Sequence, residues 1–225
     1  FPAAIRDRIA HVGHPIRKEI ETPAKEGGHE FLKLDKSVPT ILVMGGSQGA
    51  QIINNAIIDA LPQLVSSYNV IHQAGNANID EVDKLAKLVL RNTSHEERYR
   101  PFGLLNALAL RMAAGVANLV VARAGSGTIF ELATWGTPAI LVPIPEDISH
   151  DQTSNAFSYA RTGGAVVIEQ RNLTPHLLYA EIDRIIKDPA RVAEMSQAAK
   201  KFARPQSARK VATVLLDVAL QHEPV

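Results

Sequence analysis

Short apolar runs alternate along this chain with stretches in which apolar residues recur at helical spacing. The runs predict strands, and spacings of three and four residues predict amphipathic helices. The predicted strands cover residues 40–44, 69–72, 119–122, 139–142 and 165–168, and the predicted helices cover 52–60, 82–89, 129–134, 152–161, 174–187, 191–202 and 207–220. This alternation is typical of a parallel sheet covered on both faces. We therefore expect an α/β fold with a doubly wound, Rossmann-like parallel sheet.

Ligands of such sheets bind beyond the carboxyl ends of the strands, so the strand-to-helix loops are the candidates for function. The first loop, Gly45-Gly46-Ser47-Gln48-Gly49-Ala50, lets backbone N–H groups approach an anion closely. A tight turn with positive φ angles explains the glycines equally well. No Gly-Lys-Ser or Gly-Lys-Thr follows, which excludes a P-loop. The next strand ends in His72-Gln73, where a dinucleotide-binding fold usually offers an acidic residue.

A second glycine-rich loop, Arg123-Ala124-Gly125-Ser126-Gly127-Thr128, also joins a strand to a helix. Two such loops in one sheet indicate convergence on one phosphate-bearing ligand. Glu131 follows within the first turn or so of the helix. There it either interacts with the helix dipole or accepts hydrogen bonds from both hydroxyls of a ribose, and spacing alone favours the dipole.

The third loop, residues 143–150, leads into Asp151-Gln152-Thr153-Ser154-Asn155. This cluster either caps a helix or supplies the carboxylate and amide groups that recognise sugar hydroxyls. Trp135 lies late in a short predicted helix beside Gly136, which favours core packing over ligand stacking.

Composition narrows the class of protein. The 225 residues, 46% of them hydrophobic, suffice for a sizeable core, and the net charge of +1 provides no general attraction for nucleic acid or anionic lipid. The absence of cysteine excludes disulfides and thiolate metal sites, and no histidine pair has metal-ligand spacing. No apolar run approaches the roughly 20 residues that span a bilayer. We expect a cytoplasmic protein without a metal or other cofactor.

Taken together, the loops resemble those of the MurG family of UDP-N-acetylglucosamine transferases. The matching motifs follow the family's order across about residues 11–170: Gly13-His14-Pro15-Ile16-Arg17, 45–50 with Asn54 or Asn55 following, His72-Gln73-Ala74-Gly75, 123–131, 136–143 and 152–155. The resemblance implies the Rossmann-like C-terminal half of a two-domain GT-B glycosyltransferase. The chain begins at Phe1 in the middle of what reads as an element, so we expect that upstream sequence is absent.

The resemblance also implies a division of the chain. Residues 1–20 would be the end of a missing acceptor-binding domain, 21–38 a linker, 39–205 the UDP-GlcNAc-binding domain and 206–225 a C-terminal helix. Independently of the resemblance, Thr22-Pro23, Gly27-Gly28 and mixed charges without apolar periodicity indicate a linker or a surface excursion.

The binding residues implied by the resemblance come from several loops. Backbone groups of the first loop, with Ser47, would lie near the diphosphate, and Arg17 would face the same phosphates. The start of the helix after the second loop would hold the α-phosphate, Glu131 the ribose, and Gln152 with Asn155 the GlcNAc ring. The segment after Pro101-Phe102 would hold uracil. The complete set is Arg17, Gly46, Ser47, Gln48, Gly49, Gly103, Leu104, Ser126, Gly127, Thr128, Glu131, Gln152 and Asn155.

Several positions depart from the family's pattern. The family usually has Asn at His14, His at Glu146, and His or Gln at Asp151, and the segment 101–118 is a few residues longer than usual. The changes at Glu146 and Asp151 leave the identity of the sugar less certain than that of the nucleotide.

The implied reaction is metal-independent, inverting transfer of GlcNAc to the C4 hydroxyl of lipid-linked N-acetylmuramoyl-pentapeptide at the cytoplasmic membrane face. The general base would come from the missing domain, so this chain alone would bind donor with little turnover. Two alternatives remain open: another GT-B protein such as a UDP-GlcNAc epimerase or a different UDP-sugar transferase, and a non-catalytic donor-binding subunit of a split transferase. The segment 13–17 argues against the subunit, and the two glycine-rich loops argue against a purely structural module.

Overall fold

A computed structural model describes residues 9, 12–46, 50–149 and 151–221. Its centre is a six-stranded sheet in the order β3-β2-β1-β4-β5-β6. Every neighbouring pair of strands is parallel. The strands are β1 (Thr40–Met44), β2 (Asn69–Gln73), β3 (Tyr99–Phe102), β4 (Ala117–Ala122), β5 (Ala139–Leu141) and β6 (Ala165–Val167). This is the doubly wound, Rossmann-like order that the alternating pattern predicts.

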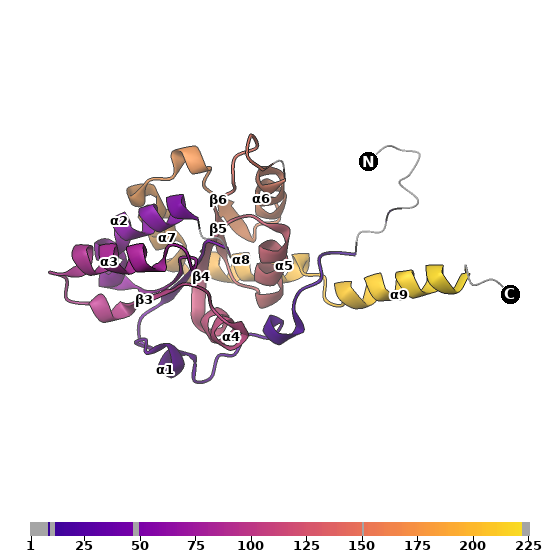
Figure 1. Cartoon of the computed structure of the whole chain (residues 1–225), viewed down its shortest axis with the longest axis horizontal. Helices are drawn as coiled ribbons and strands as arrows, with labels where there is room; N and C mark the ends of the chain where they lie inside the picture. Colours follow the sequence, from indigo (N-terminus) through magenta and orange to yellow (C-terminus); the bar gives the residue numbers. More distant parts are fainter. Residues whose placement is uncertain (1–8, 10–11, 47–49, 150, 222–225) are drawn as a thin grey trace.

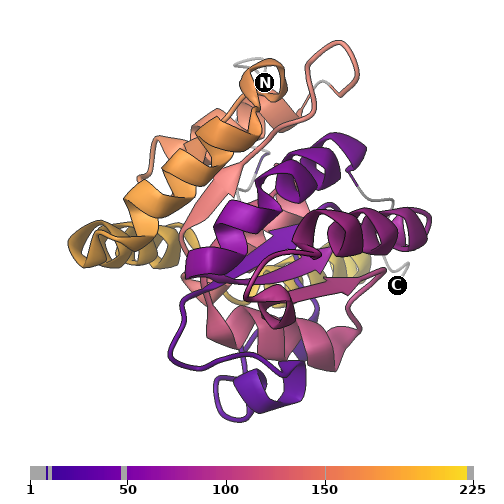
Figure 2. The same ribbon diagram turned by 90° about the vertical axis from the view of Figure 1, so that its left-hand side faces the viewer.

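Helices cover both faces of the sheet (Figures 1 and 2). On one face lie α2 (Gln51–Ser67), α3 (Ile79–Leu90) and α7 (Pro175–Ile186). On the other lie α4 (Ala107–Val116), α5 (Ser126–Trp135) and α6 (Gln152–Ala160). Helix α8 (Pro189–Phe202) packs against both α5 and α7. The 3-10 turns are η2 (Lys18–Ile20), η3 (Glu96–Arg98) and η4 (Gln170–Asn172).

Alternate residues of the central strand enter opposite cores. Ile41 and Val43 of β1 pack on the side of α2, whereas Leu42 and Met44 pack on the side of α4 and α5. Because both faces are covered, every residue of β1 is buried. This explains why the strand reads as a continuous apolar run rather than an alternating one.

The strand β3 and the helix α4 were not predicted from the sequence. Strand β3 is the four-residue edge strand Tyr-Arg-Pro-Phe, and its proline is tolerated because an edge strand needs no complete ladder. Helix α4 is a small-residue, almost wholly apolar segment, so helical periodicity is hidden. Together they account for much of the segment 101–118, which the sequence marks only as unusually long.

The segment 21–38, expected as a linker, is packed against the body of the domain. It contains the short helix α1 (Gly28–Leu32), whose Leu32 is buried. The preceding stretch is bound to α4, because the Ala24 N–H donates to the Arg111 carbonyl and Arg111 Nε donates to the Thr22 carbonyl, each at 3.0 Å.

At the C-terminal end, α9 (Ser207–Gln221) projects from the body of the domain (Figure 1). Its exposed apolar side chains include Val214, Leu215, Leu216 and Leu220. Within the described residues, no helix is long and apolar enough to cross a membrane.

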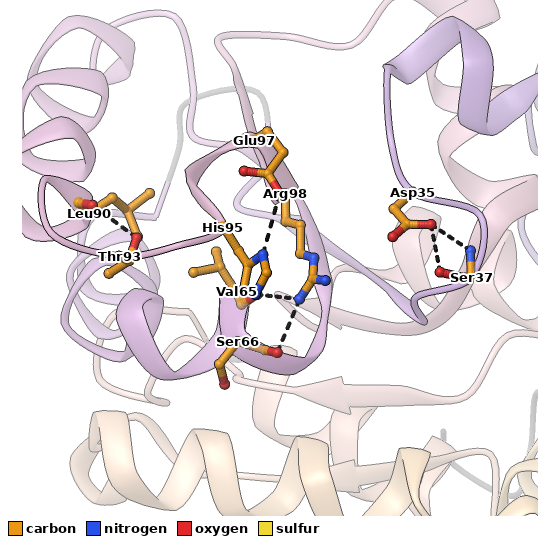
Figure 3. A network of polar contacts seen from close by, with 9 residues as sticks. All are labelled: Asp35, Ser37, Val65, Ser66, Leu90, Thr93, His95, Glu97 and Arg98. Atoms are coloured by element: carbon orange, nitrogen blue, oxygen red, sulfur yellow. Dashed lines mark hydrogen bonds and ion pairs between the residues drawn. The ribbon is translucent and has the colours of Figure 1, made fainter.

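Polar contacts lie around the end of the sheet at which the strands β1, β2 and β3 begin (Figure 3). Arg98, just before β3, donates to the Val65 and Ser66 carbonyls near the end of α2, both at 3.0 Å. Asp35 accepts hydrogen bonds from the backbone and hydroxyl of Ser37. These contacts satisfy helix and turn ends locally. The glycine-rich loops lie at the opposite end, where the strands finish.

The close contact between α4 and the segment before α1 generates a first prediction. A Cβ at Gly115 would collide with the backbone of Ala24 and Lys25. We expect Gly115→Ala to lower the free energy of unfolding by about 1–3 kcal/mol, the usual cost of overpacking. Urea unfolding followed by circular dichroism measures this.

Gly127→Ala is the matched control, because a Cβ there meets only His14 Nε2 at 3.6 Å, an ordinary contact. Its stability should stay within about 1 kcal/mol of the unsubstituted chain, or rise with helix propensity. Equal stabilities for the two variants would show that the segment 21–38 does not depend on α4.

Candidate functional site

The candidate site lies where the strand order reverses, between β1 and β4. From β1 the chain continues towards β2 on one side, and from β4 towards β5 on the other, and doubly wound sheets bind their ligands in the crevice at the carboxyl ends of two such strands. Gly46 in the first loop has φ +82°, and the space where a Cβ would point is open. The predicted binding residues Ser47, Gln48 and Gly49 fall outside the described residues.

The second loop brings the start of α5 to the same crevice. Gly125 precedes the helix in an extended conformation (φ −64°, ψ 145°), and no side chain caps the helix start. The first N–H groups of an uncapped helix are free to bind an anion. Ser126, Gly127 and Thr128 are the first three residues of α5, as the phosphate interpretation of this loop requires.

Glu131 and Arg17 form an ion pair beside this helix start. Arg17 Nη2 lies 3.7 Å from Glu131 Oε1, and the side chains are 58% and 17% exposed. The sequence placed Glu131 within the first turn or so, but α5 begins at Ser126, so Glu131 lies in the second turn. Because the helix dipole acts within the first turn, it does not by itself account for a carboxylate here.

Burial raises the pKa of the Glu131 carboxyl, and the nearby Arg17 guanidinium opposes that rise. A largely buried carboxylate whose partner is one exposed cation retains unused acceptor capacity. It can accept hydrogen bonds from an incoming pair of hydroxyls.

The segment 12–17 is held against α5 and the α8–α9 junction. Gly13 has φ +87°, and a Cβ there would come within 2.6 Å of Arg204 Cβ and Ser207 Oγ. The His14 ring stacks on Phe130 of α5, with centroids 6.3 Å apart and an interplanar angle of 24°. These contacts place Arg17 beside Glu131.

Gln152 and Asn155 lie on α6 and contact the second loop. Gln152 Oε1 accepts from the Ala124 and Ile144 N–H groups, both at 3.2 Å, and so ties the loop after β4 to the loop after β5. Asn155 Nδ2 donates to the Ala124 carbonyl at 3.5 Å. The carbonyl oxygen of Gln152 is therefore engaged by the backbone, which leaves its amide NH₂ for a ligand.

Gly103 and Leu104 follow β3, two strands away from β1. The Gly75 N–H donates to the Gly103 carbonyl at 2.9 Å, and a Cβ at Gly103 would come within 2.5 Å of Asn76 Oδ1. Leu104 is 53% exposed. A groove of 920 Å³ lies on the outer side of β3 between α1, α3 and α4 and shares Leu104 with the candidate site, but it contains neither Glu131 nor Arg17.

The structure therefore brings one set of predicted residues together and keeps another apart. Arg17, Glu131 and residues 126–128 surround the start of α5, with Gln152 and Asn155 adjoining through Ala124. Gly103 and Leu104 lie on the loops at the β2–β3 side. Within the described part of the chain, no group of three or more His, Asp or Glu residues could hold a metal ion.

Sequence reasoning missed the bridging role of Gln73. Its Oε1 accepts from the Leu105 N–H at 3.1 Å, and its backbone carbonyl accepts from the Gly45 N–H at 3.2 Å. The available signal is a polar residue at the end of a strand that is buried throughout.

A doubly wound parallel sheet with two glycine-rich loops and a carboxylate at its switch point is typical of the class of nucleotide-binding proteins. Comparison with known proteins gives the family. Residues 40–211 match the family described as "Glycosyltransferase family 28 C-terminal domain", so the chain belongs to this glycosyltransferase family.

Two curated relatives carry the name UDP-N-acetylglucosamine--N-acetylmuramyl-(pentapeptide) pyrophosphoryl-undecaprenol N-acetylglucosamine transferase. The protein of an Anaeromyxobacter species is 35% identical over 97% of this chain and 56% of its own length. That of Halothermothrix orenii is 34% identical over 97% of this chain and 59% of its own. The chain thus spans little more than half the length of these relatives.

Among solved structures, Acinetobacter baumannii MurG superposes with a TM-score of 0.71 at 26% identity, covering 88% of this chain and 55% of that one. A structure titled UDP-N-acetylglucosamine 2-epimerase superposes with a TM-score of 0.65 at 14% identity, covering 97% and 54%. At that identity the second match shows the fold alone. The expected GT-B half-fold and the family resemblance are both confirmed.

The Arg17–Glu131 pair generates a prediction about acidity. Arg17→Met keeps an apolar stem and removes the charge that lowers the pKa of Glu131. We expect that pKa, already above its ordinary value, to rise further in a carboxyl NMR titration. A raised folded-state pKa means that the folded state holds more protons, so stability decreases as pH rises through this range, and more so in the variant.

Arg184→Met is the control, because Arg184 pairs with Glu181 on α7 and should leave the pKa of Glu131 unchanged. An Arg17→Met chain in which Glu131 titrates as before would contradict the coupling.

Proposed function

We propose that this chain binds UDP-N-acetylglucosamine and forms the donor half of an inverting transferase. In the whole enzyme, GlcNAc passes to the C4 hydroxyl of lipid-linked N-acetylmuramoyl-pentapeptide at the cytoplasmic face of the membrane. The observation that carries the proposal is the Arg17–Glu131 pair beside the uncapped start of α5. The curated relatives, whose names state this transfer, support it.

In this proposal the nucleotide is bound mostly by backbone groups. The N–H groups at Ser126, Gly127 and Thr128 bind the α-phosphate, because they open an uncapped helix. Gly46 and the neighbouring residues 47–49 approach the diphosphate, and Gly103 or Leu104 meets uracil. Glu131 accepts hydrogen bonds from the two ribose hydroxyls, and exposed Arg17 turns from Glu131 towards the phosphates.

The sugar is bound from α6. Gln152 presents its amide NH₂ to the GlcNAc hydroxyls while its carbonyl oxygen holds the two loops together. Asn155 lies on the same side of α6, three residues further along. Glu146 and Asp151 are both exposed near this loop, and their carboxylates are free to accept sugar hydroxyls.

Catalysis by this half is electrostatic. As the bond to the sugar breaks, negative charge develops on the β-phosphate of the departing UDP. Helix N-termini and the Arg17 guanidinium are positioned before the reaction to stabilise that charge, so no rearrangement is needed when it forms. The general base that deprotonates the acceptor hydroxyl belongs to a part of the enzyme outside this chain.

Calorimetric titration with UDP-GlcNAc, UDP-GalNAc, UDP and NADH tests the proposal. We expect the UDP compounds to bind and Glu131→Gln to weaken UDP about tenfold or more, because a carboxylate that accepts from ribose is a charge-assisted acceptor and the amide is not. UDP affinity should also fall as pH falls through the raised pKa of Glu131, since only the ionised form accepts twice.

Glu97→Gln is the matched control: Glu97 pairs with His95 near the opposite edge of the sheet (Figure 3) and should leave UDP affinity unchanged. Binding of NADH alone, or of nothing, would overturn the proposal. Conversion of UDP-GlcNAc to a second UDP-sugar without acceptor would favour the epimerase instead.

A further inference from the structure

A buried hydrogen-bonded relay lies on one face of the sheet, between β3, β2 and α2. His72, near the end of β2, is fully buried. Its Nδ1 lies 2.8 Å from the Tyr99 hydroxyl, and its Nε2 lies 3.0 Å from Asn54 Oδ1. Asn54, also fully buried, donates from Nδ2 to the Ala74 carbonyl at 3.0 Å. The relay runs from β3 through β2 and α2 to the loop after β2.

The relay has one consistent arrangement of protons. The Ala74 carbonyl only accepts, so the Asn54 NH₂ must face it, and Oδ1 is left to accept from His72. His72 therefore carries its proton on Nε2, and Nδ1 accepts from the Tyr99 hydroxyl. The imidazole is neutral, since burial lowers the pKa of His72 to about 3.

The relay ends at Ala74, where the loops after β1, β2 and β3 are joined by hydrogen bonds. The Ala74 N–H donates to the Phe102 carbonyl and the Gly75 N–H to the Gly103 carbonyl, both at 2.9 Å. Gln73 joins the same junction on its other side by accepting from Gly45 and Leu105. The loops after β1, β2 and β3 therefore keep a common spacing that is set around residues 73–75.

Packing alone does not account for the relay. Burying an imidazole and a carboxamide costs free energy that their hydrogen bonds only offset, and apolar side chains of similar size fill a core at least as well. What the relay adds is direction, because each of its donors has one acceptor. The Ala74 carbonyl at its end accepts from Asn54 Nδ2 and also from Asn78 Nδ2, both at 3.0 Å, so Asn54 fixes this carbonyl from the side of the core and Asn78 from the side of the loop.

We propose that Tyr99, His72 and Asn54 are positioning residues for the nucleotide. This inference rests on the proposed function. The three residues hold the loop after β2 so that the Gly45–Gly46 backbone contacts the diphosphate and the Gly103–Leu104 backbone contacts the uracil of one UDP molecule. They do not contact the ligand.

The test measures UDP affinity of the full 225-residue chain by calorimetry. Asn54→Ala should weaken UDP about tenfold, the factor equivalent to one ordinary hydrogen bond of about 1.4 kcal/mol. Asn69→Ala is the matched control. Asn69 is equally buried but lies at the other end of β2, where it donates to the Asp35 and Val38 carbonyls. It should lose stability and keep its UDP affinity.

A second pair of variants, each lacking only a hydroxyl group, keeps the test valid if Asn54→Ala fails to fold. Tyr99→Phe removes only the hydroxyl that His72 Nδ1 accepts from and should weaken UDP in the same direction. Tyr68→Phe removes a hydroxyl bonded at 2.8 Å to Asp183, on α7, and should not. In ¹⁵N NMR of the unsubstituted chain, His72 should show a protonated Nε2 and an unprotonated Nδ1.

The outcomes separate the two proposals. If the unsubstituted chain binds no UDP, the proposed function fails and this inference fails with it. If it binds UDP and the Asn54 and Tyr99 variants bind equally well, or if His72 carries its proton on Nδ1, only the positioning role is overturned. Equal losses in the Asn69 control would likewise reduce the relay to a contribution to stability.

Discussion

The placement of α5 is the constraint on which the candidate site depends. The helix begins at Ser126, after the loop that follows β4 at the switch point, and its C-terminal end is anchored. Trp135, at its last turn, donates from Nε1 to the Ile20 carbonyl at 2.8 Å, and Gly136 ends the helix with φ +67°. Ser196 of α8 donates to the Gly136 carbonyl at 2.6 Å. A helix held in this way keeps its first N–H groups, Glu131 and the contact with His14 in fixed relation.

Much of this fold could be predicted because its strands are covered on both faces. Strands such as β1 and β4 are mostly apolar, and the amphipathic helices between the strands have a solvent face that shows the period. The same reasoning fails where one of those conditions is absent. The edge strand β3 contains Arg100 and Pro101, and α4 has too few polar residues to show its exposed face. Neither failure displaces the switch point, which β1 and β4 define.

The site was predicted less completely than the fold, for a reason that lies in long-range contacts. Glycine loops and a nearby glutamate are visible in the sequence because their spacing is local. The pairing of Arg17 with Glu131 joins residues more than a hundred positions apart, and the two bonds to Gln152 Oε1 depend on how β4 and β5 align. The sequence pattern does not show which donor and acceptor will form a hydrogen bond over such separations. Trp135, interpreted as a core residue, is confirmed as one, although its indole N–H also has a specific backbone acceptor.

In the proposed function, nucleotide and sugar are bound by different kinds of group, which affects how the recognition of each tolerates substitution. The groups assigned to the nucleotide are mainly backbone amides held by strand ends, helix starts and the contacts around residues 73–75. Most side-chain substitutions leave such amides in place. The groups assigned to the sugar are side chains of α6 and the preceding loop. The carbonyl oxygen of Gln152 already accepts two hydrogen bonds from the backbone. The departures at Glu146 and Asp151 fall within this second set. If these assignments hold, we expect sugar preference to diverge more readily than UDP recognition in this fold, because the sugar groups are all side chains whereas most of the nucleotide groups are backbone amides, with Glu131 and Arg17 as the exceptions.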